Sequence, residues 1–211
     1  MLIQGKSGSL EVAIDEPKVN QYSNLNVVIC HPHPLYQGTM HNKVVTTIAR
    51  AFKEIGVRCI RFNFRGIGAS NGSYDNGVGE IDDVISVIHW VQKKYETKHI
   101  ILSGFSFGGA MAYRAAGHVE GIISLCTVAP AVVNFPLDQY MVPNVPWLVI
   151  QGVDDEVVSA QSVFECVLKD HQSNTALIKL DGVGHFFHGN LILLKNELQF
   201  YYKERLKKWL I

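Results

Sequence analysis

The hexapeptide Gly-Phe-Ser-Phe-Gly-Gly at residues 104–109 is the feature that most constrains how this chain can fold. It follows an apolar run at residues 100–102 and precedes a helix-like stretch at residues 110–116. Glycines have no Cβ, so they allow a tight turn between a buried strand and the helix that follows it. In that context the pattern predicts that Ser106 lies at the tip of the turn as a nucleophile. The alternative, in which Ser106 only caps the helix, explains the hydroxyl but not the flanking glycines.

Apolar runs and segments with helical spacing alternate along the chain. Strands are expected at residues 10–14, 25–30, 57–62, 100–103, 122–128, 147–150 and 176–180. Helices are expected at residues 44–55, 81–91, 110–116, 162–168 and 191–210. Near-continuous apolar strands separated by helices indicate a parallel sheet that is covered on both faces. No linker or repeat interrupts the pattern, so we expect residues 1–211 to form a single α/β domain.

Charge and composition restrict the partners of such a domain. The 211 residues include 19 Lys and Arg against 19 Asp and Glu, and this zero net charge argues against nucleic acid and anionic membranes as partners. No run of about 18 apolar residues predicts a membrane span, and the N-terminus has no apolar stretch of signal-peptide length. The cysteines have no Cys-x-x-Cys spacing, so we expect reduced, mostly buried thiols in a cytoplasmic protein: Cys30, Cys59, Cys126 and Cys166.

A serine hydroxyl is a poor nucleophile at neutral pH. Ser106 therefore needs a base that accepts its proton and a carboxylate that orients the base. In a parallel α/β sheet these partners are expected after later strands, in the order serine, acid, histidine. His185 follows the strand predicted at residues 176–180 and is the predicted base. His188 is the poorer candidate, because it lies farther along, near the start of the last helix.

The acid is expected in the loop at residues 151–158, which follows the strand predicted at 147–150. Asp154, Asp155 and Glu156 are consecutive in this loop, and two of the three should be solvated charges or local caps. The residue types alone do not choose between Asp154 and Asp155.

Attack on a carbonyl carbon places negative charge on the carbonyl oxygen, which needs two preorganised donors. The backbone N–H of Phe107, directly after the nucleophile, is one predicted donor. The other is expected from the loop after the strand at residues 25–30, where two prolines have no N–H. The N–H of His33 is therefore the predicted second donor, with those of Leu35 and Tyr36 as alternatives.

Two cofactor sites are weighed against this interpretation. His31, His33 and His41 could bind a metal ion, but no cluster of carboxylates or cysteines completes a ligand set. The glycine-rich turn at residues 66–72 is reminiscent of a dinucleotide-binding loop, but its spacing is Gly-x-Gly-x-x-x-Gly and no acidic residue ends a second strand behind it. We therefore expect neither a metal nor another cofactor.

Five motifs occur in order along the chain: H-P-H-P-L-Y-Q-G-T-M-H-N-K-V-V (31–45), F-N-F-R-G-I-G-A-S-N-G (62–72), G-F-S-F-G-G (104–109), Q-G-V-D-D-E-V-V (151–158) and G-H-F-F-H-G (184–189). Together they resemble the α/β-hydrolase superfamily, in particular small serine hydrolases related to dienelactone hydrolase and short-chain esterases. The resemblance implies a doubly wound, mostly parallel sheet of about seven to eight strands with helices on both faces. It also implies hydrolysis through an acyl-enzyme on Ser106, and the superfamily pattern places the acid at Asp155.

The substrate is constrained by the segment that holds a cap in many hydrolases. Residues 129–146 are too few for a cap domain, so we expect an open site for a small ester, thioester or lactone. The candidate pocket residues are Leu35, Tyr36, Phe105 and Tyr140, with a further wall from Phe135, Leu137 and Met141. A catalytically quiet binding or regulatory protein on the same fold is the alternative, because a fold does not fix a function.

Overall fold

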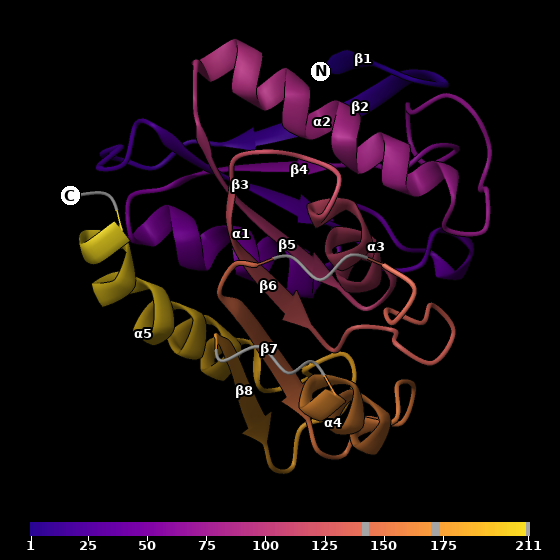
Figure 1. Cartoon of the computed structure of the whole chain (residues 1–211), viewed down its shortest axis with the longest axis vertical. Coiled ribbons are helices and arrows are strands. Elements are labelled where there is room, and N and C mark those ends of the chain that lie inside the picture. The colour runs from indigo at the N-terminus through magenta and orange to yellow at the C-terminus, as the bar shows by residue number, and fades with distance from the viewer. Residues whose placement is uncertain (141–143, 170–173, 210–211) are drawn as a thin grey trace.

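The computed structural model describes residues 1–140, 144–169 and 174–209, which form one eight-stranded sheet with helices on both faces (Figure 1). In spatial order the strands are β1 (Leu2–Gly5), β2 (Gly8–Asp15), β4 (Arg58–Phe62), β3 (Leu25–Cys30), β5 (His99–Phe105), β6 (Ile122–Val128), β7 (Trp147–Gly152) and β8 (Thr175–Leu180). In this spatial order, neighbouring strands pair in parallel from β4 through β3 and β5 to β8. At the edge, β1 pairs antiparallel with β2, and β2 pairs antiparallel with β4. The predicted doubly wound, mostly parallel sheet is confirmed.

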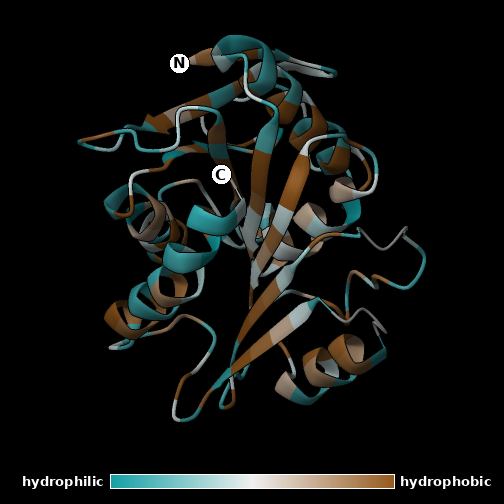
Figure 2. Cartoon of the chain, turned by 60° about the vertical axis from the view of Figure 1, so that its left-hand side comes forward, coloured by the Kyte–Doolittle hydropathy of each residue, from teal (hydrophilic) through white to brown (hydrophobic). Residues whose placement is uncertain are grey.

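Five α-helices in the described ranges cover the sheet. α1 (Lys43–Glu54) and α5 (Leu191–Trp209) pack on one face, and α2 (Gly79–Tyr95), α3 (Phe107–Ala116) and α4 (Ala160–Lys169) pack on the other. Within β3, Val28 contributes to the core beneath α2 and α3, whereas Val27 contributes to the core beneath α1 and α5. In Figure 2 the central strands are mostly brown, and hydrophilic teal residues are concentrated on the surrounding helices and loops. Among these helices, none is long and apolar enough to cross a membrane.

The antiparallel edge differs most from expectation. β1 is not predicted, because it has only four residues and alternates exposed and buried positions around a single buried aliphatic side chain, Ile3. β2 is predicted at residues 10–14 and extends over Gly8–Asp15, where it pairs antiparallel with β4. A short 3-10 helix, η1 (Pro34–Tyr36), also forms in the loop after β3, where no regular structure is predicted.

A buried ion pair joins the loop after β4 to the start of α2. The Arg65 guanidinium donates to both carboxylate oxygens of Asp83, at 3.0 and 2.7 Å, and also to the carbonyl of Gly79. The Arg65 and Asp83 side chains are only 7% and 1% exposed, so the pair is shielded from water, whereas the second carboxylate near Arg65, that of Asp75 at 3.8 Å, is exposed. The ion pair thus holds Arg65, the residue before the glycine-rich turn at residues 66–72, against the start of α2.

We expect Asp83→Asn to destabilise the protein by about 3–5 kcal/mol, because it removes the buried counter-charge of Arg65 and leaves the exposed carboxylate of Asp75, 3.8 Å away, as its remaining ion-pair partner. Asp82→Asn is the matched control. Asp82 pairs with Lys6 at 2.9 Å, but these side chains are 36% and 69% exposed, and an exposed pair contributes about 1 kcal/mol or less. Urea unfolding followed by circular dichroism measures both variants. Equal losses of stability would contradict the importance of the buried pair.

Candidate active site

Ser106 lies between the last residue of β5 and the first residue of α3. Its backbone has φ 55° and ψ −119°, a conformation that residues other than glycine rarely adopt. Its N–H donates to the carbonyl of Val128 at 2.9 Å, and its side chain makes no capping hydrogen bond to α3. A role as helix cap therefore does not account for the hydroxyl.

Close backbone contacts explain the glycines around Ser106. A Cβ on Gly104 would collide with the carbonyl of Gly108. A Cβ on Gly108 would collide with the carbonyls of Cys30 and His31, at the end of β3. The start of α3 consequently lies directly against the end of β3, and Ser106 lies beside the loop that follows β3.

The structure brings together the three side chains predicted as nucleophile, base and acid. His185 Nε2 lies 3.1 Å from Ser106 Oγ, and His185 Nδ1 lies 2.8 Å from Asp155 Oδ2. The three residues come from the loops that follow β5, β7 and β8, at the carboxyl edge of the sheet. The His185 and Asp155 side chains are 3% and 0% exposed, so their contact is shielded from water.

Asp155, and not Asp154, contacts His185. The second carboxylate oxygen of Asp155, Oδ1, accepts the N–H groups of Val157 and Val158 at 2.9 and 2.7 Å. Burial raises the pKa of Asp155, but hydrogen bonds from His185 and these two N–H groups outweigh burial and hold that pKa below its ordinary value. Asp154 is exposed. The geometry thus selects one of the two candidates that the residue types left open.

Glu156, the third consecutive acid, has a role that the sequence does not reveal. Its Oε2 accepts the backbone N–H of His185 at 3.1 Å and so restrains the chain that carries the imidazole. A Cβ on the preceding residue, Gly184, would lie 2.7 Å from the same oxygen, so the glycine leaves room for this contact. The sequence signals for this contact are the Gly-His pair after β8 and the acidic residue next to Asp155.

The predicted oxyanion donors lie where the loop after β3 meets α3. The rings of His33 and Phe107 are in contact, with centroids 5.0 Å apart. Within the described ranges, neither the His33 N–H nor the Phe107 N–H donates a hydrogen bond. Phe107 is the first residue of α3, where an N–H has no partner inside the helix. Both N–H groups are therefore without a hydrogen-bond partner among the described residues.

The alternative donors in this loop are already engaged. The N–H of Leu35 donates to His33 Nδ1 at 3.2 Å, and the N–H of Tyr36 donates to the His33 carbonyl at 3.1 Å. Because Nδ1 is an acceptor, His33 carries its proton on Nε2, which lies 3.2 Å from the hydroxyl of Tyr74. Burial lowers the pKa of His33 and so favours this neutral form.

His31 is fully buried and uses both ring nitrogens on the backbone. Nδ1 lies 2.6 Å from the carbonyl of Pro32, and Nε2 accepts the N–H of Phe64 at 3.0 Å, so the proton is on Nδ1. Burial lowers the pKa of His31 to about 4. The ring is therefore unavailable to a metal ion. Among the described residues, no three His, Cys, Asp or Glu side chains are grouped so that they could hold one.

His31 makes stability depend on pH within a defined window. The unfolded chain protonates a histidine below about 6.5, whereas the folded protein does so only near the pKa of about 4. Between these values the unfolded state binds the extra proton, so the contribution of His31 is complete above pH 6.5 and is lost as the pH falls toward 4. We expect a loss of about 2 kcal/mol between pH 6.5 and pH 5.

Urea unfolding of the wild type and His31→Gln at both pH values measures this contribution. The variant removes the titrating ring, so it should be less stable near neutral pH but lose less stability on acidification. Other histidines contribute equally to both proteins and cancel in the comparison. The same loss in both proteins would show that His31 is not the group that titrates.

Two of the candidate pocket residues are open to solvent. Leu35 and Tyr36 are 66% and 82% exposed on η1, next to the His33 N–H. Tyr140 is half-buried, and the guanidinium carbon of Arg114 lies 4.6 Å from its ring centroid. Met141, predicted in the same wall, lies outside the described residues.

Phe105 requires a correction, because its side chain is fully buried and does not line an open pocket. It is the last residue of β5 and packs in the core shared with α1 and α5, where its ring lies 4.9 Å from the His185 imidazole. The Phe105 ring therefore packs against the His185 imidazole from the side of the core. Phe135 and Leu137 are also buried, and the Phe135 ring packs on Phe107 with centroids 4.9 Å apart.

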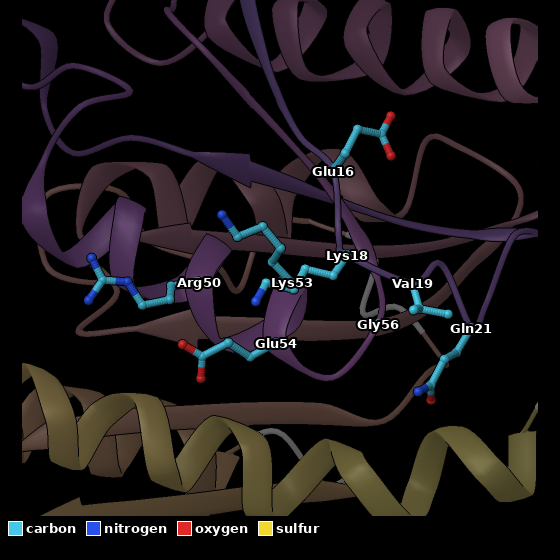
Figure 3. Close-up of a pocket in the computed structure, with 8 residues that line it drawn as sticks. All are labelled: Glu16, Lys18, Val19, Gln21, Arg50, Lys53, Glu54 and Gly56. Atoms are coloured by element: carbon cyan, nitrogen blue, oxygen red, sulfur yellow. The ribbon is translucent and has the colours of Figure 1, made fainter.

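A separate hollow of about 600 Å³ lies between the loop after β2 and the end of α1 (Figure 3). Its walls carry both signs of charge, from Glu16 and Glu54 and from Lys18, Arg50 and Lys53, which Figure 3 labels around the hollow. The residues of this hollow precede β3 and β4, whereas Ser106 follows the end of β5. The hollow therefore lies at the opposite edge of the sheet and is not part of the candidate active site.

A profile of the alpha/beta hydrolase fold family matches residues 26–149. An uncharacterized protein of Rickettsia prowazekii is 34% identical over 171 residues, which cover 76% of this chain and 71% of the relative. The chain belongs to the α/β hydrolase fold family, as the motifs predicted.

Two solved structures narrow the class. An alpha-beta serine hydrolase homologue from Coxiella burnetii is 42% identical, with a TM-score of 0.89 over 95% of each chain. A serine hydrolase without a lid from Xanthomonas campestris is 38% identical, with a TM-score of 0.89 over 100% of this chain and 94% of that one. The chain is thus a lidless homologue of the α/β serine hydrolases.

Proposed function

We propose that this protein is a serine hydrolase that cleaves a small ester, thioester or lactone through an acyl-enzyme on Ser106. The observation that carries the proposal is the continuous set of contacts from Ser106 Oγ to His185 Nε2, at 3.1 Å, and from His185 Nδ1 to Asp155 Oδ2, at 2.8 Å. A hydroxyl, an imidazole and a carboxylate in this order form the arrangement that activates a serine at neutral pH.

In the proposed first step, Ser106 Oγ attacks the carbonyl carbon while its proton moves to His185 Nε2. The negative charge of Asp155 stabilises the imidazolium that results, and its hydrogen bond keeps the proton of Nδ1 in place. The carbonyl oxygen becomes an oxyanion. The N–H groups of Phe107 and His33, which have no partner among the described residues, are the donors proposed to bind it, and this would lower the barrier most at the transition state.

When the tetrahedral intermediate collapses, the bond from carbon to the leaving group breaks and His185 Nε2 gives its proton to that group. The product of this half-reaction is an acyl ester of Ser106. A water molecule then attacks the ester while His185 accepts its proton, and the second collapse returns the proton to Ser106 Oγ. The protein ends in its starting state, with one water consumed.

Three observations support a small or accessible substrate. Leu35 and Tyr36 are exposed beside the proposed oxyanion donors. The segment after β6 contributes buried side chains such as Phe135 rather than a separate domain above Ser106. The Xanthomonas campestris homologue is a serine hydrolase without a lid.

Fluorophosphonate labelling tests the proposal directly, because the probe reacts with a serine only when its base is in place. We expect stoichiometric labelling, with the adduct on the peptide that contains Ser106. Short p-nitrophenyl esters, thioesters and lactones then identify the acyl chemistry. A folded protein that is neither labelled nor active on this panel would instead favour a binding or regulatory role on the same fold.

We expect hydrolysis to persist after prolonged EDTA treatment, because side chains and backbone N–H groups of the chain supply every step of the proposed reaction. The measurement is turnover before and after chelation, with and without added zinc. Loss of activity that zinc restores would show that a metal ion takes part.

A further inference from the structure

Gln151 is a buried polar residue and the next-to-last residue of β7, just before the loop that carries Asp155. Its side-chain Nε2 donates to Asp155 Oδ2 at 2.9 Å and to the carbonyl of Gly152 at 3.0 Å. Both protons of the amide are therefore in use. The other amide atom, Oε1, is buried and has no hydrogen-bond partner in the described part of the chain.

This unpaired oxygen is informative. A buried acceptor without a donor destabilises a fold, and an apolar side chain of similar size would leave no such atom. The unpaired oxygen offsets part of the stability that the two amide hydrogen bonds supply, so stability alone gives no strong reason for an amide at this position. The contact of Gln151 with the carboxylate oxygen that also binds His185 offers a different explanation.

With Gln151 included, Asp155 accepts four hydrogen bonds. Oδ1 receives the N–H groups of Val157 and Val158, while Oδ2 receives Gln151 Nε2 and His185 Nδ1. The Asp155 side chain is 0% exposed, so water does not replace a missing donor. Both the orientation of the carboxylate and the charge on each oxygen are consequently set by these four groups.

We propose that Gln151 is a positioning residue that acts through Asp155: it fixes Oδ2 opposite His185 Nδ1 and withdraws part of the charge that would otherwise hold the imidazolium. The inference rests on the proposed hydrolase function. Without the amide donor, Oδ2 is more negative, so His185 keeps its proton to a higher pH. Oδ2 then keeps only its bond to His185, so the carboxylate is less firmly oriented and the imidazole is less well aligned with Ser106.

Gln151→Met tests the inference, because methionine has a similar volume and cannot donate a hydrogen bond. In the pH profile of kcat, we expect the midpoint of the acid limb to move upward by about 0.5 pH unit or more, since a bond to a charged group is involved. We expect the plateau of kcat to fall about 10-fold, because the orienting contact is weakened. The melting temperature should change little, because the variant removes the unpaired oxygen but also the donor to Asp155 Oδ2 and to the Gly152 carbonyl.

Gln161→Met is the matched control. Gln161 Nε2 also donates to a carboxylate, Glu165 Oε1 at 2.8 Å, but this contact is exposed on α4. It should leave both the acid limb and the plateau as they are in the wild type. Gln151→Leu is a second variant that cannot donate a hydrogen bond, and it should move the acid limb and the plateau in the same directions as Gln151→Met.

An unchanged profile in Gln151→Met would overturn the inference, and so would a loss of activity accompanied by a lower melting temperature and an unmoved acid limb. If Gln151→Met does not fold, Gln151→Leu decides by the same criteria. Titration of the His185 ring nitrogens by NMR in wild type and variant measures the same shift without a substrate. A wild type that is inert to fluorophosphonate would refute the hydrolase proposal, while this titration would still decide the role of Gln151.

Discussion

Ser106→Ala is expected to lower turnover by more than about 10³-fold, the loss typical of a nucleophile that acts together with a base. The free energy of unfolding should change little, because the hydroxyl makes no capping bond and its partner is the imidazole of His185. Steady-state hydrolysis and urea unfolding of the same preparation separate the two effects. Fluorophosphonate labelling should disappear in the variant.

Ser103→Ala is the control for this experiment. It removes another buried hydroxyl from β5, one without a hydrogen-bond partner in the described residues, and should keep most of the activity. Near-normal turnover of Ser106→Ala on a true substrate would exclude Ser106 as the nucleophile. Equal losses in both variants would point to damage to the strand rather than to the chemistry.

Asp155→Asn is the second substitution for which a very large effect is expected, about 10³- to 10⁴-fold in kcat. The neutral side chain no longer stabilises the imidazolium, and its amide group can present a donor to Nδ1. The productive tautomer of His185, with the proton on Nδ1 and a free Nε2 facing Ser106, is then disfavoured.

Asp154→Asn makes the same chemical change one residue away. Asp154 is exposed, so this variant should keep near-normal kcat. The comparison requires kcat/KM and the rate of fluorophosphonate labelling for both proteins. A larger loss in Asp154→Asn would transfer the orienting role to that residue.

The central strands are predictable from the sequence because burial on both faces leaves a continuous apolar run. The runs at residues 25–30 and 122–128 coincide with the observed bounds of β3 and β6. The helix α2 extends over Gly79–Tyr95 and is longer than its predicted range of 81–91. Its last turn is polar, so this turn does not continue the apolar spacing on which the prediction rests. The edge strand β1 carries too few buried residues for its pattern to be recognised.

A residue of the candidate site can be predicted from the sequence when it has the required type and follows a predicted strand in the expected order of serine, acid and histidine. Ser106 and His185 meet this condition, and the structure places them 3.1 Å apart. Asp155 is distinguished from Asp154 only by the turn in which its Oδ1 accepts two backbone N–H groups, which sequence does not reveal without the family resemblance. Phe105 is misassigned because a phenylalanine beside the nucleophile can face either the substrate or the core, and the last position of β5 faces the core.

The distribution of the site along the chain has a consequence for how the protein acquires its reactivity. Ser106 and His185 are 79 residues apart, and the loop of His33 comes from the strand β3, which lies between β4 and β5. Contacts of such large sequence separation form only after extensive loop closure. Under the proposed mechanism, we expect partly folded or newly emerging chains to carry a serine without its base. Reactivity of Ser106 toward electrophiles is then expected to appear only when β8 and the loop after it have joined the sheet.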